Sequence, residues 1–229
     1  MIRLINLYAL NSKYAKVHPL EKVLLVFISL ISCSYTENIY LIMLNIIFFS
    51  ILSINAKNSF NMIKKFLTIV IIYSIFTTIT LMVTYDVKYI IVLLLRGVNG
   101  GLTISFLALT TPLNHIVYLM SRNNLTREIA DIAKSMETFI LVIEKDFDVT
   151  FKAMKSRGGF GSFKKSIKDF AKVCSIVMRN LFFRWKEISE GLKNRCYNGK
   201  YNYNYIFNIS KKRILLILFY GIVVLIIII

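Results

Sequence analysis

The sequence predicts an all-α integral membrane protein with about five transmembrane helices and long amphipathic cytoplasmic helices. Three observations support this prediction. First, hydrophobic residues make up 56% of the 229 residues and the mean hydropathy is +0.62, both above the usual range of soluble domains. Second, the apolar residues gather in segments of spanning length. Third, Lys and Arg gather in alternate loops, as expected for a multi-pass chain.

Five apolar segments are of spanning or near-spanning length, against a requirement of about 20 residues. They lie near residues 20–36, 39–54, 66–84, 89–111 and 213–229. The second segment is the shortest and could pair with the first as a tight hairpin around Thr36, Glu37 and Asn38. No small-x-small cleavage site follows the first segment, so we expect a retained span rather than a signal peptide.

The positions of Lys and Arg set the expected orientation. Most of the 29 Lys and Arg residues lie between residues 112 and 213, whereas the loops assigned to the outside hold only Lys88. We therefore expect a cytoplasmic N-terminus, a bundle of four spans over 1–111, a cytoplasmic region over 112–212, and a final helix over 213–229 whose C-terminus lies outside. The net charge of +17 would face the cytoplasm, where nucleic acid, anionic lipid or an acidic protein surface could bind.

Two long amphipathic helices are expected inside the cytoplasmic region. Apolar residues recur in steps of three and four from Ile129 to Met154, and again from Phe163 to Leu192 after a glycine-rich break. Charges interrupt the first stripe too often for a membrane span, since the uncharged stretch TFILVI in its middle has only six residues. Helices of nearly thirty residues reach about 40 Å, so each could cross the footprint of two partner subunits.

The two expected helices end alike. The stretch AMKSR at 153–157 aligns with GLKNR at 191–195, and an apolar residue stands three positions before each arginine. Helix-stop residues follow both ends, GG at 158–159 after the first and NG at 198–199 after the second. Both arginines therefore take the same phase relative to their apolar stripes.

The stretch AMKSRGGFGS has three other interpretations. A phosphate-binding loop needs G-x-x-x-x-G-K-[ST] after a strand, whereas Lys165-Ser166 follows Lys164 and no strand pattern precedes it. An RNA-binding RGG element recurs within a disordered tract, whereas this one is single and lies between periodic helices. A capped helix end with an arginine, favoured by the helix dipole by about 0.3–1 kcal/mol, explains one occurrence better than a matched pair.

The two endings resemble the arginine motifs, usually Ala-Arg-Gly, of the transmembrane T component of energy-coupling factor transporters, the EcfT/CbiQ family. In this sequence the motifs read Ser156-Arg157-Gly158 and Asn194-Arg195-Cys196. The stretches HPLEK, TTPLNHIVYLM, KAMKSRGGF and RWKEISEGLKNRCYNGKY are similar to the cobalt-type branch, and the resemblance covers nearly the whole chain. The second motif departs from the family pattern at Cys196, where glycine is usual, and at Gly191, where alanine is usual.

The resemblance implies a scaffold subunit of a prokaryotic ATP-driven importer, with cobalt as the cargo. It implies as partners two ABC-type ATPase subunits and a small membrane subunit that captures the substrate, an S component or a cobalt-type M subunit. The ends at Arg157 and Arg195 would each dock into one ATPase subunit and pass its motion to the membrane part. Nickel or a vitamin stays open as cargo, because the capture subunit selects it. A basic membrane anchor that recruits nucleic acid or anionic lipid is the rival function.

The fourth expected span holds a further candidate, made of Arg96, Gly97, Asn99 and Gly101. An ionisable group inside a membrane is a functional hypothesis by default, and two glycines four residues apart let helices approach closely. We expect these residues to act in helix packing or in contact with the capture subunit. Snorkelling of Arg96 toward the outer face is the alternative.

No catalytic site, metal site or cofactor is expected. The only histidines, His18 and His115, have no carboxylate at ligand spacing, and the three cysteines lack C-x-x-C spacing. No catalytic dyad or triad is present, so we expect a non-catalytic subunit whose ATPase partners hydrolyse ATP. An aromatic run before the last span is expected to form an interfacial belt. The run comprises Tyr197, Tyr201, Tyr203 and Tyr205.

Overall fold

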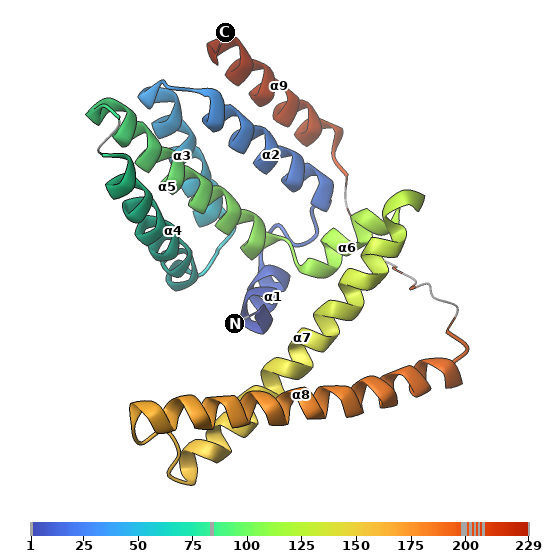
Figure 1. Ribbon diagram of the computed structural model, residues 1–229. Helices are drawn as coiled ribbons and strands as arrows, with labels where there is room; N and C mark the ends of the chain where they lie inside the picture. Colours follow the sequence, from blue (N-terminus) through green and yellow to red (C-terminus); the bar gives the residue numbers. More distant parts are fainter. Residues whose placement is uncertain are drawn as a thin grey trace. The chain divides into compact units, whose positions relative to one another are not determined.

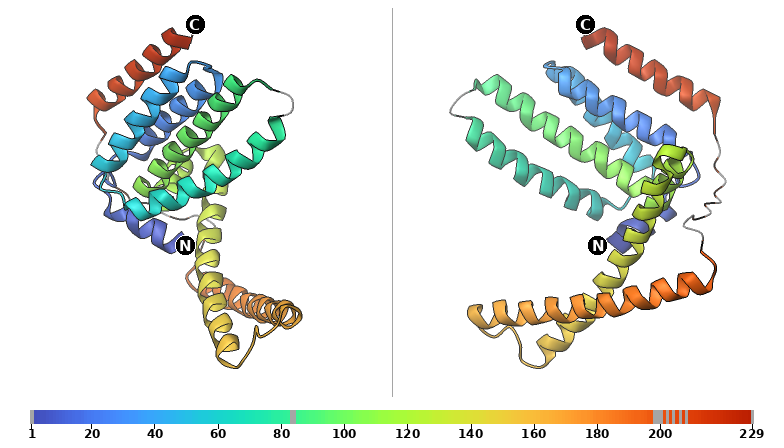
Figure 2. Two further views of the ribbon diagram at one scale, coloured as in Figure 1. Left: turned by 90° about the vertical axis from the view of Figure 1, so that its left-hand side faces the viewer. Right: turned by 45° about the vertical axis from the view of Figure 1, so that its right-hand side comes forward.

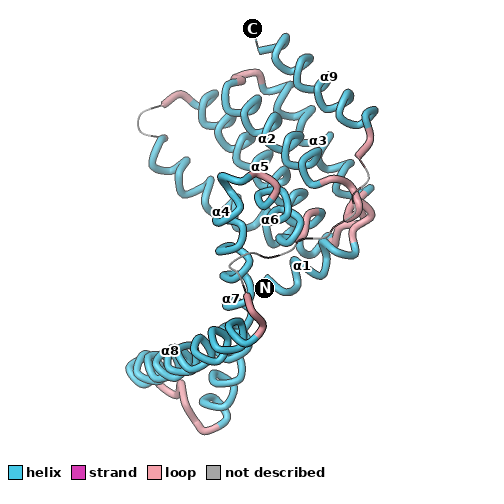
Figure 3. Tube along the Cα trace, turned by 90° about the vertical axis from the view of Figure 1, so that its right-hand side faces the viewer, coloured by secondary structure: helices cyan, strands magenta, loops and turns pink. Residues whose placement is uncertain are grey.

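The computed structural model describes residues 2–82, 85–197, 201, 203, 205, 207 and 209–228, and within these ranges it contains α-helices and no strands (Figure 3). The predicted all-α class is confirmed. The chain folds as two compact units. The first unit comprises Met1–Leu119 and Asn204–Ile229, and the second comprises Met120–Tyr203.

The first unit is organised around one helix. Its helices are α1 (Ile2–Asn11), α2 (Pro19–Tyr35), α3 (Ile39–Asn55), α4 (Phe60–Leu81), α5 (Val87–Thr110), most of α6 (Leu113–Ser121) and α9 (Lys211–Ile228), shown in Figure 1. Helix α5 contacts α1, α2, α3 and α4, and α2 also contacts α9 (Figure 2). Phe49 of α3 is buried against Leu102, Phe106 and Leu109 of α5, which form the largest part of the apolar core.

Two glycines let α4 approach α5 closely. A Cβ atom on Gly101 would lie 3.0 Å from a methyl carbon of Val70, and one on Gly97 would lie 3.2 Å from the Cβ of Ser74. Both distances are shorter than ordinary van der Waals contacts, so larger residues would push the two helices apart. The pair therefore works as a close-packing motif between α4 and α5.

Polar side chains also hold the helices of the first unit together. Asn45 of α3 donates to Ser29 Oγ at 2.9 Å and to Cys33 Sγ at 3.0 Å, and Asn99 of α5 donates to the same sulfur at 3.0 Å. Tyr220 of α9 donates to Asn45 Oδ1 at 2.9 Å. These bonds tie α2, α3, α5 and α9 together where apolar contacts alone leave their register loosely defined.

Two helices, α4 and α5, are long and apolar enough to cross a membrane among the described residues. The expected count of about five spans is therefore not confirmed. Helices α2 and α3 have 17 residues each and reach only about 26 Å. Helix α9 has 18 residues but begins with Lys211, Lys212 and Arg213, which shortens its apolar part. All three fall below the length of a full hydrocarbon core, about 30 Å.

The second unit consists of two long helices, α7 (Asn124–Ser156) and α8 (Phe163–Asn194). Both helices expected from the spacing of apolar residues are confirmed, and each is longer than its stripe. Three kinds of contact join α7 to α8. Phe139 stacks on Trp185 with ring centroids 5.8 Å apart, and Phe147 meets the edge of Phe170 at 6.1 Å. Arg184 binds both carboxylate oxygens of Asp146 at 3.0 Å.

Much of the apolar stripe of each long helix stays uncovered. Met136 of α7 is 57% exposed, and Phe182 and Trp185 of α8 are 65% and 62% exposed. Isolated exposed apolar residues are ordinary, but a continuous exposed stripe marks an interaction surface or a membrane contact. The second unit therefore has a large apolar surface that no described residue covers.

Candidate functional site

Helix α7 ends in a Schellman motif built around Arg157. This residue caps the helix with φ −87° and ψ 18°, and the following Gly158 takes the left-handed conformation with φ +74°. The N–H of Gly158 donates to the carbonyl of Lys155 at 3.2 Å, and that of Gly159 donates to Met154 at 3.1 Å. These two bonds define the motif and satisfy carbonyls that the last helical turn leaves open.

Helix α8 ends in the same way around Arg195. The capping arginine has φ −93° and ψ 13°, and Cys196 takes the left-handed conformation with φ +52°. The N–H of Cys196 donates to Lys193 at 3.0 Å, and that of Tyr197 donates to Leu192 at 3.1 Å. The two ends thus share their backbone geometry as well as their sequence pattern.

Cys196 holds the position that Gly158 holds in the first motif. A residue with a Cβ atom in the left-handed region is disfavoured by about 1–2 kcal/mol relative to the ordinary helical region, whereas glycine adopts it freely. The expected stop residues Asn198 and Gly199 lie outside the described residues. Among the described residues, Cys196 and Tyr197 donate the two bonds that end this helix.

The loop after Arg157 is fixed by contacts to α8. Asp169, which is 6% exposed, accepts from the N–H of Phe160 at 3.1 Å, and the ammonium of Lys165 donates to the carbonyl of Gly158 at 3.1 Å. The ring of Phe160 packs on Phe151 with centroids 4.7 Å apart. A Cβ on Gly159 would lie 2.8 Å from the carbonyl oxygen of Met154, so glycine is required there. The stretch AMKSRGGFGS is therefore a structured turn between helices.

Both arginines are exposed, and the structure keeps them apart. The side chains of Arg157 and Arg195 form no hydrogen bond or ion pair with any residue that the structure describes. Arg157 caps the C-terminus of α7, just before α8 begins at Phe163, and Arg195 caps the C-terminus of α8. The 32 residues of α8 span about 48 Å. The two motifs are thus separate surface sites on one rigid element.

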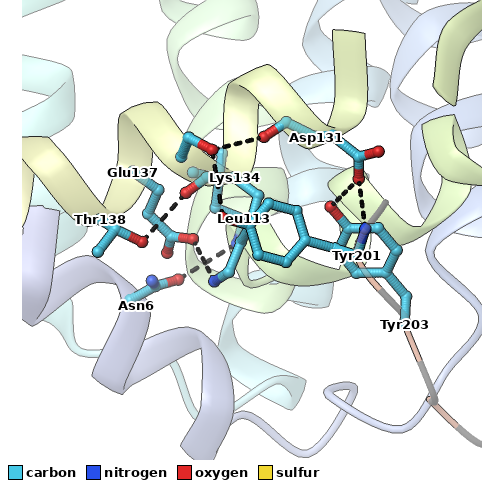
Figure 4. A network of polar contacts seen from close by, with 9 residues as sticks. Asn6, Leu113, Asp131, Lys134, Glu137, Thr138, Tyr201 and Tyr203 are labelled. Carbon is cyan, nitrogen blue, oxygen red and sulfur yellow. Dashed lines mark hydrogen bonds and ion pairs between the residues drawn. The ribbon is translucent and has the colours of Figure 1, made fainter. Parts of the chain in front are cut away.

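The second unit also contains an acidic–aromatic cluster that sequence reasoning missed (Figure 4). Asp131 of α7 accepts from the hydroxyl of Tyr203 at 2.9 Å and from the backbone N–H of Tyr201 at 3.4 Å. Nearby, Lys134 pairs with Glu137 at 2.8 Å. Asp131 stands beside an apolar stripe, which is a weak signal, but its partners follow about 70 residues later and sequence spacing could not identify them.

A cleft of about 560 Å³ adjoins this cluster, with Met136 of α7 and Trp185 of α8 among its lining residues. Burial, with the neighbouring Tyr201 and Asp131, raises the pKa of Tyr197 to about 12. Burial and the hydrogen bond to Asp131 raise the pKa of Tyr203 as well. Both phenols are therefore neutral near pH 7, and Tyr203 is a donor rather than an acceptor.

The candidate residues of the fourth expected span lie in α5. Gly97 and Gly101 face α4, and Asn99 is fully buried against Cys33. Arg96 donates to the carbonyl of Thr36 at 2.9 Å. Since Thr36 caps the C-terminus of α2, this cation lies where the helix dipole favours positive charge. The structure thus brings these residues into contact with α2 and α4, and their contact with a capture subunit stays a prediction.

The two histidines lie near each other against the ring of Phe207. The centroid of His18 lies 5.6 Å from this ring and that of His115 lies 4.8 Å from it. Nδ1 of His18 accepts from the N–H of Leu20 and so begins α2. Burial and the ammonium of Lys22 lower the pKa of His115, which is therefore neutral near pH 7. Among the described residues, no group of three or more His, Cys, Asp or Glu side chains could hold a metal ion.

The geometry of the two helix ends predicts opposite effects of two matched substitutions. Cys196→Gly should raise the free energy of unfolding by about 0.5–1 kcal/mol, because it relieves a left-handed non-glycine residue. Gly158→Ala should lower it by a similar amount for the converse reason. Thermal unfolding of both full-length variants in detergent measures this difference. A change of the same sign in both variants would contradict the matched-cap geometry.

Parts of the chain are similar to known proteins. Residues 11–205 match the family CbiQ, described as cobalt transport protein. A fused cobalt transport protein CbiMQ of Methanocorpusculum labreanum is 22% identical over 116 residues, which are 51% of this chain and 19% of that protein. An uncharacterized protein, MJ1089, of Methanocaldococcus jannaschii is 23% identical over 105 residues, which are 46% of this chain and 39% of that protein. The matching segments thus cover less than half of each relative's own length.

Proposed function

The chain belongs to the CbiQ family of cobalt transport proteins, and from this premise we propose that it is the transmembrane coupling subunit of an ATP-driven importer. It is a membrane transport component, and the proposal assigns it the part that joins the ATPase subunits to a substrate-capture subunit. The chain itself carries out no chemical step in this proposal. Hydrolysis of ATP takes place in the partner ATPase subunits.

One observation carries this proposal, the matched pair of arginine-capped helix ends on a single rigid element. Arg157 and Arg195 each project from a Schellman motif with the same two backbone bonds. A guanidinium stays charged and presents a planar fork that suits a carboxylate in a partly buried groove. The two sites are separated by α8, which is about 48 Å long, and two such separate sites suit two copies or paralogues of one partner. In the proposal, Ser156, Gly158, Asn194 and Cys196 shape the same two docking sites.

The exposed apolar stripes supply the second half of the mechanism. Closure of two ATPase subunits on ATP would move the two helix ends relative to each other, and α7 and α8 would carry this motion as rigid bodies. Phe139, Trp185 and the Asp146–Arg184 pair lock the two helices together, so that a displacement at one end reaches the other. The uncovered stripes then transmit the motion to the membrane part and the capture subunit.

Cobalt is the cargo that we propose. The family description and the name of the CbiMQ relative both refer to cobalt transport. The fused name of that relative also supports a second cobalt transport part as a partner of this chain. We assign substrate binding to the capture subunit. Nickel or a vitamin in the same complex is the alternative.

The proposed topology is multi-pass, with about five spans, a cytoplasmic N-terminus and an external C-terminus. It places residues 1–111 and 213–229 in the membrane and 112–212 in the cytoplasm. We expect a cysteine that replaces Asp86 to react with an impermeant thiol reagent in intact cells and one that replaces Ser162 to remain unlabelled. Both positions are exposed, so accessibility on the folded chain does not limit either reaction. Labelling at residue 162 would overturn the cytoplasmic assignment and the docking proposal with it.

Affinity purification of the full chain from its native membrane tests the proposed function against its rival. Recovery of two ABC-type ATPase equivalents supports the coupling role. Salt-sensitive recovery of RNA or DNA without ATPase would instead support a basic membrane anchor, because phosphate contacts weaken steeply as salt rises. Direct cobalt binding by the isolated chain would contradict the assignment of the substrate site to another subunit.

A further inference from the structure

A second cavity, of about 600 Å³, lies in the first unit between α2, α3, α5 and α9. Its volume is in the range of about 300–1,000 Å³ that is usual for small-molecule sites. The cavity is amphipathic along its length. Glu21, Lys22 and Arg213 line it where α2 and α9 begin, and every other lining residue is aliphatic or aromatic.

The charged end is a built structure. The carboxylate of Glu21, 3% exposed, is 3.1 Å from Nε of Arg213 and accepts from the N–H of Ser210 at 3.2 Å. The ammonium of Lys22 donates to the carbonyl of Thr110 at 2.7 Å. These contacts fix two cations and one anion at the charged end of the cavity. A guanidinium can contact a carboxylate and a second anion at once, because it carries five N–H donors.

The excess of positive charge at this end extends beyond the lining residues. Exposed lysines flank the lining segments on both sides, at Lys13 and Lys16 beside Tyr14 and Val17, and at Lys211 and Lys212 beside Arg213. Glu21 is the only acidic residue in these segments. Clusters of Lys and Arg at the cytoplasmic boundary of membrane helices attract anionic lipid head groups.

An aromatic pair lines the apolar end of the cavity. Phe48 of α3 stacks on Tyr220 of α9 with centroids 5.4 Å apart, and the Tyr220 hydroxyl donates to Asn45 at 2.9 Å. Both aromatic residues line the cavity, and the Tyr220 hydroxyl is already bonded to Asn45. From Arg213 to Tyr220 the cavity follows α9 for about 10 Å, so it suits the first part of a hydrocarbon chain rather than a polar solute.

From this polarity we infer that the cavity binds an anionic glycerophospholipid, with the phosphate at Arg213 and Lys22 and one acyl chain between α3 and α9. A metal ion or a nucleotide would leave the apolar walls without a partner, and an uncharged apolar ligand would leave the cationic rim without one. The inference needs only the membrane location of the first unit. Its failure would leave the proposed coupling role untouched.

Native mass spectrometry of the full chain in detergent, titrated with dioleoyl phosphatidylglycerol or dioleoyl phosphatidylcholine, tests the inference. We expect tighter retention of the anionic lipid. Leu216 lines the cavity and Leu218 does not, although both are exposed residues of α9. Leu216→Trp should lower the affinity for phosphatidylglycerol by more than about tenfold, since each buried methylene contributes about fourfold and the indole displaces several. The matched variant Leu218→Trp should change it by less than about twofold.

A second variant tests the head-group contact without changing the net charge. This is the double variant Glu21→Gln, Arg213→Gln. The amide oxygen introduced at position 21 can still accept from the N–H of Ser210. Because the carboxylate is removed together with its cationic partner, no unpaired buried charge remains. The preference for phosphatidylglycerol over phosphatidylcholine should fall, because the guanidinium at the phosphate is lost while Lys22 remains, and the melting temperature should stay near that of the unmodified chain. Equal retention of both lipids by the unmodified chain would overturn the inference. So would unchanged retention by Leu216→Trp, or occupation of the cavity by a helix of a co-purified subunit.

Discussion

Replacing Arg157 and Arg195 together with alanine should abolish co-purification of the ATPase subunits and uptake of cobalt, while expression and membrane insertion stay near normal. The fold should tolerate the change because both side chains are exposed and a charged residue at a helix end contributes at most about 1 kcal/mol. Loss of a charge-assisted, partly buried contact should cost about 2–5 kcal/mol of binding, much of it from the carboxylate left unpaired on the partner. Pull-down and cobalt uptake measure the two effects.

A matched control separates the docking contact from the loss of charge. Arg122 and Arg179 are also exposed, and replacing both with alanine removes the same two charges at other positions of the chain. This control should keep its ATPase subunits. The double Arg→Lys variant at 157 and 195 should recover binding only in part, since an ammonium cannot form the bidentate fork. Equal loss of ATPase co-purification in the control and in the docking variant would show that net charge, and not a specific docking contact, causes the effect.

Gly101→Leu should destabilise the first unit by about 1–3 kcal/mol, and by more if α4 cannot move. The side chain would have to enter space where even a Cβ lies 3.0 Å from Val70. The matched variant Gly100→Ala should be neutral or slightly stabilising, because a Cβ there meets its nearest atom at 3.9 Å and alanine favours the helix. Thermal unfolding in detergent measures both. A melting temperature of Gly101→Leu equal to that of the unmodified chain would show that α4 and α5 do not pack closely at this residue.

The two long helices could be predicted from the sequence because their apolar residues keep one period over more than seven turns. The glycine pair at 97 and 101 could also be recognised, since small residues four apart have few other uses in an apolar helix. Both patterns depend on the spacing of residues that are close together in the sequence, so they can be recognised without a structure. The matched arginines at 157 and 195 could be paired for the same reason, because each keeps its phase relative to its own stripe.

Other features depended on contacts between distant segments. Asp131 meets Tyr203 across 72 residues, and Asn45 meets Tyr220 across 175 residues, so no spacing rule could pair them. The alignment of the two helix ends placed Cys196 opposite Gly158, but a non-glycine residue does not by itself indicate a positive φ. Span boundaries depend on where helices stop, and α2 ends at Tyr35 because Thr36 leaves the helical region with ψ 129°.

The most direct test of the coupling proposal counts the ATPase subunits bound to each single-arginine variant, in the absence of nucleotide, by mass measurement of the intact complex. The unmodified chain should hold two ATPase subunits. Arg157→Ala and Arg195→Ala should each hold one, and the double variant none, with Arg157→Ala affecting transport at least as strongly because the motif at Arg195 is more divergent. Retention of two subunits by both single variants and by the double variant would contradict a two-site docking role for these helix ends.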